Sequence, residues 1–180
     1  ADKLAVGVSG NLLLNSELVS TRGWAFYDGT AGQADMPNTG LNKPDAAWQL
    51  VRGNTLAIHQ VGTTQSPQIW FTDMPCEAGK RYEFFAYLAS HRCNARVRIE
   101  WYNAAFTSRV VYHDTIDSVS NVGGGSALSS YVKIAAFGVA PSNAAVARFC
   151  FFKGATLAGN TDSWAWCTHP YFGVASTAQT

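Results

Sequence analysis

The sequence has little charge and no long apolar run. Charged residues make up 14% of its 180 residues, against about 25% in an average globular protein. The 13 basic residues are scattered, so the dense basic footprint that binds nucleic acid is missing. No stretch of about 18 apolar residues is present, so we expect no membrane span. The aromatic share of 13% and hydrophobic share of 47% exclude a disordered, collagen-like or coiled-coil chain. One folded domain is expected at this length, and two at most.

Helical signals are also scarce. No long window keeps apolar residues at i, i+3, i+4 and i+7 behind a capping residue, and the alanine-rich pieces are interrupted by Gly138 and Pro141. Short aromatic and β-branched runs separated by turn residues are present instead, and they predict an all-β sandwich or barrel. The predicted strands are 48–52, 56–61, 68–73, 81–89, 96–102, 110–112, 131–139, 146–153 and 163–167. The glycine-containing stretches 28–45 and 118–130 are expected to be loops.

Several segments, taken in order, resemble one family. The opening Asn11-Leu12-Leu13-Leu14-Asn15 followed by Gly23-Trp24 is similar to the start of jelly-roll carbohydrate-binding modules. The stretch 78–84 looks like that family's turn-and-strand PGxxYxF, 140–148 resembles its AP-small-small-A-x-AR segment, and 164–167 occupies the place of its final strand. The resemblance implies a two-sheet antiparallel β-sandwich, the jelly roll, with no catalytic activity.

Other segments have the look of the versions carried by phages. Residues 1–6 are similar to the segment that joins such a module to a siphophage central tail fibre, and 87–93 and 101–103 look phage-borne as well. The resemblance implies a piece of a large host-specificity protein, assembled in the bacterial cytoplasm and located in the virion. Its partners would be a host cell-surface glycan and the rest of the fibre, which is trimeric in such tails.

This interpretation also divides the chain. We expect a connecting segment at 1–10, the carbohydrate-binding module at 11–175 and a short tail at 176–180. Because no coiled-coil heptad is present, the isolated domain should be monomeric or weakly associating. Two alternatives stay open: a structural or assembly domain of the tail tip without an open sugar site, and a binding module of a secreted polysaccharide-degrading enzyme.

Catalytic signatures are missing from the sequence. The paired acids nearest in sequence, Asp114 and Asp117, fall at a predicted loop, where nothing holds two carboxylates across a sugar. No nucleophile elbow, phosphate loop or zinc-protease motif occurs. A Ser–His–Asp site is recognised by geometry and stays open at this point, but we expect a protein that is not an enzyme.

Two features of the sequence bear on metal binding. The family often carries an Asp pair near its end that helps to hold calcium, where this chain has Thr168-His169. Calcium prefers charged oxygen ligands. Separately, the pairs His91/Cys93 and Cys167/His169 each have the i, i+2 spacing of one strand face, and zinc accepts two Cys and two His. That spacing fits no common zinc motif, so no metal and no cofactor are predicted.

The redox state of the four cysteines would distinguish a phage tail protein from a module of a secreted enzyme. Three pairings would be possible if all were oxidised. A phage tail protein folds in the bacterial cytosol, where thiols stay reduced, so we expect free thiols. A module of a secreted enzyme would instead favour disulfides.

Two strands carry the candidate binding residues. If Val97, Ile99 and Trp101 are buried, then their neighbours on the strand share its other face, and burial of the even-numbered residues 82–88 likewise sends their neighbours outward. We expect one outer face, aromatic and polar together, that suits the apolar side and the hydroxyls of a sugar. Its candidate residues are Phe85, Tyr87, His91, Arg98, Glu100, Tyr102 and the rim aromatic Trp164. Trp24, Trp48, Trp70 and Trp101 are expected in the core.

Overall fold

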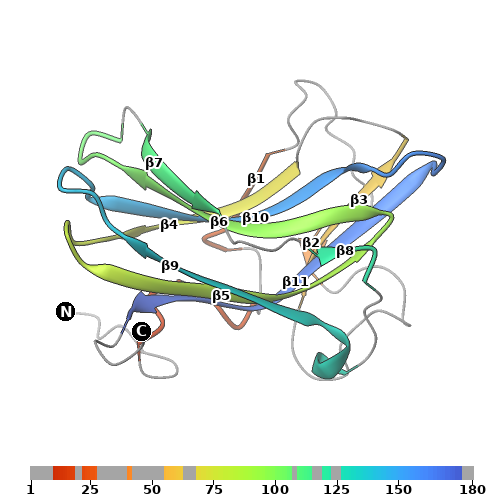
Figure 1. Cartoon of the computed structure of the whole chain (residues 1–180), viewed down its shortest axis with the longest axis horizontal. Coiled ribbons are helices and arrows are strands. Elements are labelled where there is room, and N and C mark those ends of the chain that lie inside the picture. Colours follow the sequence, from red (N-terminus) through yellow and green to blue (C-terminus); the bar gives the residue numbers. More distant parts are fainter. Residues whose placement is uncertain are drawn as a thin grey trace.

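A computed structural model describes residues 10–18, 22–27, 40–41, 55–62, 68–106, 109–114, 119–122 and 127–175. Within these ranges the chain is all-β, with one short 3-10 helix (Figure 1). The elements are β1 (Ala25–Tyr27), β2 (Gly40–Leu41), β3 (Leu56–Val61), β4 (Gln68–Pro75), β5 (Arg81–His91), β6 (Cys93–Tyr102), β7 (Arg109–Asp114), β8 (Val119–Ser120), η1 (Leu128–Ser130), β9 (Val132–Val139), β10 (Val146–Thr156) and β11 (Asp162–Val174). No helix in this part of the chain has the length and apolar character needed to cross a membrane.

The strands form two antiparallel sheets that lie face to face (Figure 1). Sheet A has the order β1-β4-β10-β6-β7, with β8 also paired to β6, and sheet B has the order β2-β3-β11-β5-β9. The predicted two-sheet β-sandwich is therefore confirmed. Each strand predicted within the described ranges is present, although β9 begins one residue late, after η1. The predicted strand at 48–52 and most of the predicted loop at 28–45 lie outside those ranges.

Consecutive strands change sheet at Arg92. Strand β5 pairs with β11 and β9 in sheet B, whereas β6 pairs with β10, β7 and β8 in sheet A. Arg92 has a left-handed backbone, with φ of 59°. Its N–H donates to Asn121 Oδ1 at 3.0 Å, its carbonyl accepts from the N–H of Leu157, and its guanidinium pairs with Asp162. The turn therefore sends the chain from one layer to the other instead of closing a hairpin.

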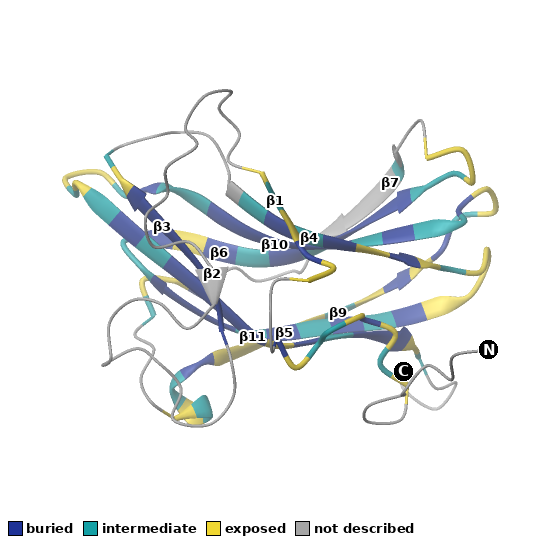
Figure 2. Cartoon of the chain, turned by 180° about the vertical axis from the view of Figure 1, so that it is seen from behind, coloured by how far each residue is buried: buried dark blue, intermediate teal, exposed yellow. Residues whose placement is uncertain are grey.

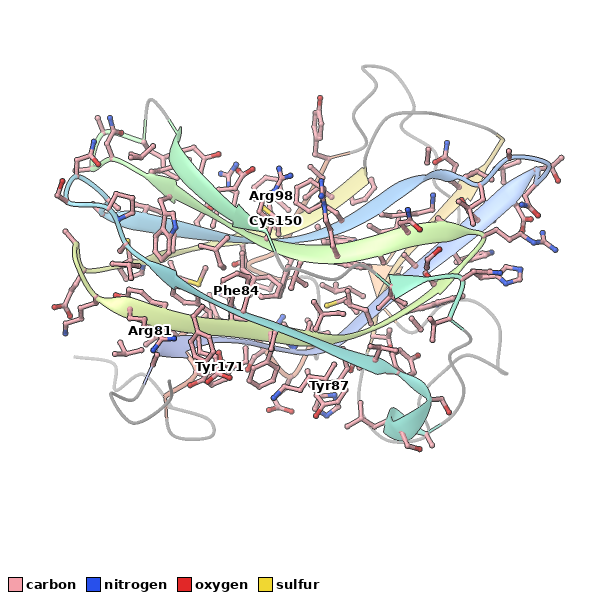
Figure 3. The ribbon with its side chains drawn as sticks, viewed as in Figure 1. Arg81, Phe84, Tyr87, Arg98, Cys150 and Tyr171 are labelled. Atoms are coloured by element: carbon pink, nitrogen blue, oxygen red, sulfur yellow. The ribbon has the colours of Figure 1, made fainter. Side chains whose placement is uncertain are left out.

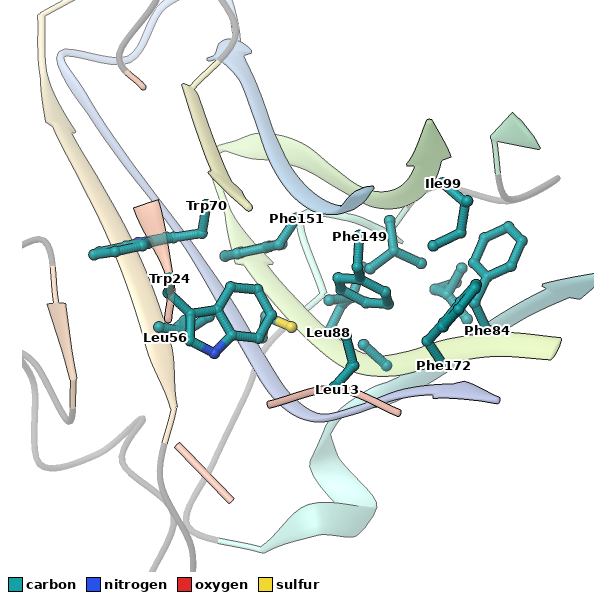
Figure 4. Packing of buried hydrophobic residues seen from close by; sticks show 14 of the residues in the cluster. Leu13, Trp24, Leu56, Trp70, Phe84, Leu88, Ile99, Phe149, Phe151 and Phe172 are labelled. Carbon is teal, nitrogen blue, oxygen red and sulfur yellow. The ribbon is translucent and has the colours of Figure 1, made fainter. Parts of the chain in front are cut away.

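The core lies between the sheets and follows the alternation of each strand. Buried and solvent-facing residues alternate along the central strands (Figure 2). Predicted core residues Trp24, Trp70 and Trp101 are buried in one cluster, while Trp48 lies outside the described residues. The same cluster includes the large side chains Leu13, Leu56, Phe84, Leu88, Ile99, Phe149, Phe151 and Phe172 (Figure 4).

The opening Asn-Leu-Leu-Leu-Asn motif fastens the chain to β11. Asn11 Oδ1 accepts the N–H groups of Leu13 and Phe172, both at 3.1 Å, and its Nδ2 donates to the carbonyl of Pro170 at 3.1 Å. The Leu12 N–H donates to the Phe172 carbonyl at 2.7 Å. Because β3 pairs with β11 only as far as Cys167, this segment supplies hydrogen-bond partners to the backbone of β11 beyond that point.

Asn11→Ala should therefore lower the free energy of unfolding by about 1–2 kcal/mol, because it leaves partly buried backbone groups without their partners. Asn143→Ala, in an exposed turn, is the matched control and should stay within about 0.5 kcal/mol of the parent. Urea unfolding of the three proteins measures both changes. Equal effects of the two substitutions would contradict this role of Asn11.

A lysine is enclosed between the sheets. Lys153, on β10, is 0% exposed, and its Nζ donates to Gln60 Oε1 at 3.3 Å and to the Gly154 carbonyl at 3.1 Å. Both acceptors are neutral, and burial lowers the pKa of the Lys153 ammonium from its usual 10.5. The protonated form of this side chain therefore costs folding free energy.

Lys153→Met should accordingly raise the free energy of unfolding at pH 7 by about 1–3 kcal/mol. In the parent protein, the free-energy cost of burying the charged Lys153 side chain is present in full at pH values below the lowered pKa of the folded state. It fades as the pH rises from that value towards 10.5, since the folded state loses the proton first. Urea unfolding across this range should show the two proteins converging. A constant difference at all pH values would contradict a charge effect.

Candidate functional site

The outer side of sheet A carries a mixed polar and aromatic surface. Strand β6 alternates as predicted: Val97, Ile99 and Trp101 are buried in the core, and Arg98, Glu100 and Tyr102 occupy the other face. The register places Arg148 of β10 between Glu100 of β6 and Asp73 of β4. We call this outer side of the sheet the A face, and its residues are Phe71, Asp73, Arg96, Arg98, Glu100, Tyr102, Phe106, Arg148, Cys150 and Phe152. Glu100, Cys150 and Phe152 are buried within it. The ribbons of sheet A are bowed, with the outer side concave (Figure 1).

Arg148 organises the A face. Its Nε donates to Asp73 Oδ1 at 2.7 Å and its Nη2 donates to Oδ2 at 3.0 Å, which is a bidentate pair. The guanidinium carbon also lies 4.1 Å from the ring centre of Phe71, 5.0 Å from that of Tyr102 and 5.1 Å from that of Phe106. Burial alone would lower the pKa of Arg148, but the hydrogen bond and charge of Asp73 raise it. The guanidinium is therefore held in place by one carboxylate and three aromatic rings.

Glu100 forms a second polar group beside Arg148. The Tyr102 hydroxyl donates to Glu100 Oε2 at 2.8 Å, and Arg98 Nη1 lies 3.5 Å from Oε1. Burial, together with the hydrogen bond and charge of Glu100, raises the pKa of Tyr102 to about 12, so the phenol keeps its proton and donates. Arg98 also lies over the ring of Phe152, at 4.4 Å. The site thus offers fixed planar donors and acceptors next to aromatic rings.

The four cysteines of the chain are free thiols in the structure. One of them, Cys150, lies in the A face, opposite Arg98 on β6 and Phe71 on β4 in the strand register. Burial raises its pKa well above the ordinary value, so it remains a protonated thiol. The side chain of Cys150 is smaller than those of its register partners Arg98 and Phe71, and it lies between them at the base of the A face.

The other predicted site residues lie on the opposite side of the molecule. Phe85, Tyr87 and His91 of β5 and Trp164 of β11 are on the outer side of sheet B, which we call the B face. Figure 3 shows Tyr87 and Arg98 on opposite sides of the sandwich. The expectation that both sets share one face is wrong, because the chain changes sheet at Arg92.

The B face is also rich in aromatic rings. Phe85 stacks on Tyr171 with ring centres 4.7 Å apart, and the Lys133 ammonium lies 4.1 Å from the Phe85 ring centre. Tyr87 contacts Phe85 edge-on at 6.5 Å. Elsewhere on the face, Trp164 stacks on His59 at 3.6 Å, next to a small cluster that contains Trp166 and Tyr131. Burial lowers the pKa of His59.

The zinc alternative considered from the sequence is not supported by the arrangement of the strands. Cys93 and Cys167 face the core, whereas His169 is exposed and His91 lies on the B face. Within the described part of the chain, no group of three or more His, Cys, Asp or Glu side chains is placed to hold a metal ion. Of the acids Asp114 and Asp117, the first ends β7 and the second lies outside the described residues.

Sequence reasoning missed the centre of the A face. Arg148, Asp73, Phe71 and Phe106 were not among the predicted site residues. The alternation of residues along 146–153 places Arg148 on the face opposite Phe149, and this pattern could have identified Arg148 as an outward-facing candidate. What the sequence did not reveal is that β4, β10 and β6 are neighbours, which brings Asp73, Arg148 and Glu100 into one row.

No protein-family model matches the sequence, and no curated protein sequence matches it. Solved structures do resemble it. The module TmCBM61 in complex with β-1,4-galactotriose has a TM-score of 0.59 and 9% identity, covering 93% of this chain and 100% of that one. The CBM22-1–GH10 modules of Clostridium thermocellum xylanase 10B complexed with xylohexaose have a TM-score of 0.60 and 9% identity, covering 96% of this chain and 30% of that one.

One similar structure comes from a phage. The enzymatically active domain of bacteriophage CBA120 tailspike protein 4 has a TM-score of 0.61 and 13% identity, and the match covers 92% of this chain and 21% of that one. The chain therefore spans less than a third of the tailspike and xylanase chains that it resembles. At these identities the likeness establishes the fold, which is the β-sandwich fold of carbohydrate-binding modules.

Proposed function

We propose that this chain is a non-catalytic carbohydrate-binding module that binds a glycan on the A face. The observation that carries the proposal is the setting of Arg148, which is bidentate to Asp73 and surrounded by Phe71, Tyr102 and Phe106 on the solvent side of a sheet. The side chains of a strand face that contacts only water are not usually held by a bidentate ion pair and several aromatic contacts. The fold shared with carbohydrate-binding modules supports the same conclusion.

The A face matches the two surfaces of a pyranose. The apolar C–H side of the ring packs on aromatic side chains, and the hydroxyl groups around the ring require directional donors and acceptors. Arg98, Glu100 and Asp73 supply these groups in positions already held by hydrogen bonds and ion pairs. Because the partners are ordered before the sugar arrives, binding loses little side-chain entropy.

We place the module in a phage tail fibre, where it would recognise host cell-surface glycan during adsorption. The support is the sequence resemblance of residues 1–6, 87–93 and 101–103 to phage-borne modules, together with the likeness to a phage tailspike. Its partners would be the rest of a trimeric fibre, and its location the virion. A module of a secreted polysaccharide-degrading enzyme is the second candidate, and the likeness to a xylanase module favours it.

A glycan array probed with the 180-residue chain tests the binding function. β-1,4-Galactotriose and xylohexaose, the sugars bound by two similar modules, are included as defined probes. We expect at least one glycan to bind, and we expect substitutions in the A face to remove that binding. An array without any bound glycan would favour a structural role in assembly.

The redox state of the cysteines tests the setting. The four thiols are unbridged, and protein isolated from its natural source should take up four labels when it is denatured and alkylated without reductant. Mass spectrometry counts the labels. A pair that resists labelling would be a disulfide and would favour the secreted-enzyme module, since disulfides persist in oxidising compartments.

A further inference from the structure

Three aromatic side chains and one lysine form a compact group on the B face. We call it the B platform: Phe85 and Tyr87 of β5, Tyr171 of β11 and Lys133 of β9. The register places Tyr87 opposite Lys133 and Phe85 opposite Tyr171. Phe85 contacts both Tyr87 and Tyr171, and all three rings are half-buried rather than enclosed in the main core. Figure 3 shows Tyr87 and Tyr171 on the outer side of sheet B.

The charge of the B platform differs from that of the A face. On the A face, Arg148 is paired with Asp73, and Arg98 is 3.5 Å from Glu100. Lys133 is exposed and lies over the ring of Phe85, and it has no ion pair among the described residues. Glu83 is the nearest acid along β5 and lies two residues from Phe85, about 7 Å along an extended strand, but no ion pair joins it to Lys133. Lys133 is therefore a cation without an ion-pair partner in the described part of the chain, opposite Tyr87 in the register.

We propose that the B platform is a second ligand site, separate from the A face, and that its ligand is an acidic sugar such as a uronic acid. A pyranose that stacks on the Tyr87 ring would direct a carboxylate towards the ammonium of Lys133, which lies opposite Tyr87 in the strand register. A neutral sugar would leave that cation without a partner. The complementary chemistry is thus one apolar ring face and one negative charge.

The two sites act independently because they lie on opposite outer sides of the sandwich. Packed sheets are about 10 Å apart, and the A face and the B platform point away from each other (Figure 3). One sugar residue cannot contact both. A surface that displays both kinds of glycan would engage the module twice, which raises its avidity without new contacts.

The test uses trigalacturonate as the acidic probe and β-1,4-galactotriose as its neutral counterpart. Calorimetric titration of the 180-residue chain should show that trigalacturonate binds and that its affinity falls when sodium chloride is raised. Tyr87→Ala should weaken that binding by about 5- to 30-fold. Lys133→Gln should weaken it about 3- to 10-fold and remove most of the salt dependence. Lys80→Gln, an exposed lysine in a turn, is the matched control and should change nothing.

The outcomes separate this site from the A face. Trigalacturonate binding that survives Arg148→Lys but not Lys133→Gln supports the B platform, even where no neutral glycan binds and the A face fails as a site. Absence of trigalacturonate binding overturns the proposal. So does binding that is lost in Arg148→Lys and kept in both Tyr87→Ala and Lys133→Gln. Because Lys133 is exposed, its variant keeps the test valid if Tyr87→Ala melts early.

Discussion

Replacement of Trp101 by alanine should lower the free energy of unfolding by about 3–5 kcal/mol. Trp101 is 0% exposed and contacts the rings of Tyr82 and Phe172, with ring centres 5.6 and 6.2 Å away. Removing the indole leaves a void between the two sheets that the surrounding side chains fill only in part. Urea unfolding and thermal melts measure the loss.

The next residue along the strand is the control for this prediction. Tyr102 faces the opposite way, into the A face, and is only partly buried. Tyr102→Ala should cost clearly less stability than Trp101→Ala, and it should weaken glycan binding. A Trp101→Ala variant that stays fully stable and stops binding would mean that the two faces of β6 have exchanged roles.

Arg148→Ala should weaken binding of the glycan identified on the array by about 30- to 150-fold, which corresponds to about 2–3 kcal/mol. The substitution removes the planar donor and leaves Asp73 without its bidentate partner. It also removes the group on which Phe71, Tyr102 and Phe106 converge. Calorimetric titration measures the affinity, and thermal melts verify that the domain remains folded.

Two further variants make the Arg148 result specific. Arg148→Lys keeps the charge but lacks the planar fork, so it should recover only part of the affinity. Arg92→Ala removes an arginine that pairs with Asp162 at the strand crossing, away from the A face, and should leave the affinity unchanged. Unaltered affinity in Arg148→Ala would show that the A face is not the glycan site.

Much of the local structure was predictable from short stretches of sequence. The strands at 81–89 and 96–102 were identified from their alternation, and the assignment of Val97, Ile99 and Trp101 to the core and of Arg98, Glu100 and Tyr102 to the other face is confirmed. The short strands and the turn residues between them predicted a sandwich or a barrel, and the family resemblance then implied the two-sheet sandwich. A family resemblance in the opening motif located Asn11, whose role in holding β11 required the structure.

The candidate site was predictable only in part. The outward residues of β5 and of β6 were identified correctly, but they were combined into one face. Two consecutive strands with a short connection usually pair as a hairpin within one sheet. Under that assumption, the outward residues of both strands lie on the same face. Here Arg92 adopts a left-handed backbone and is bonded to Asn121, Leu157 and Asp162, all distant in sequence. The sequence around residue 92 gives no indication of these long-range contacts.

The sequence by itself determined which side of each strand is apolar, because successive side chains of a strand point to opposite faces and this period of two is a local property. Only the tertiary structure decided which strands are neighbours. Pairing of β10 with both β4 and β6 brings Asp73, Arg148 and Glu100 into one row from positions far apart in the chain. It also separates Tyr87 from Arg98, which are close in sequence, because strand pairing depends on long-range hydrogen bonds and core packing rather than on the order of the strands along the chain.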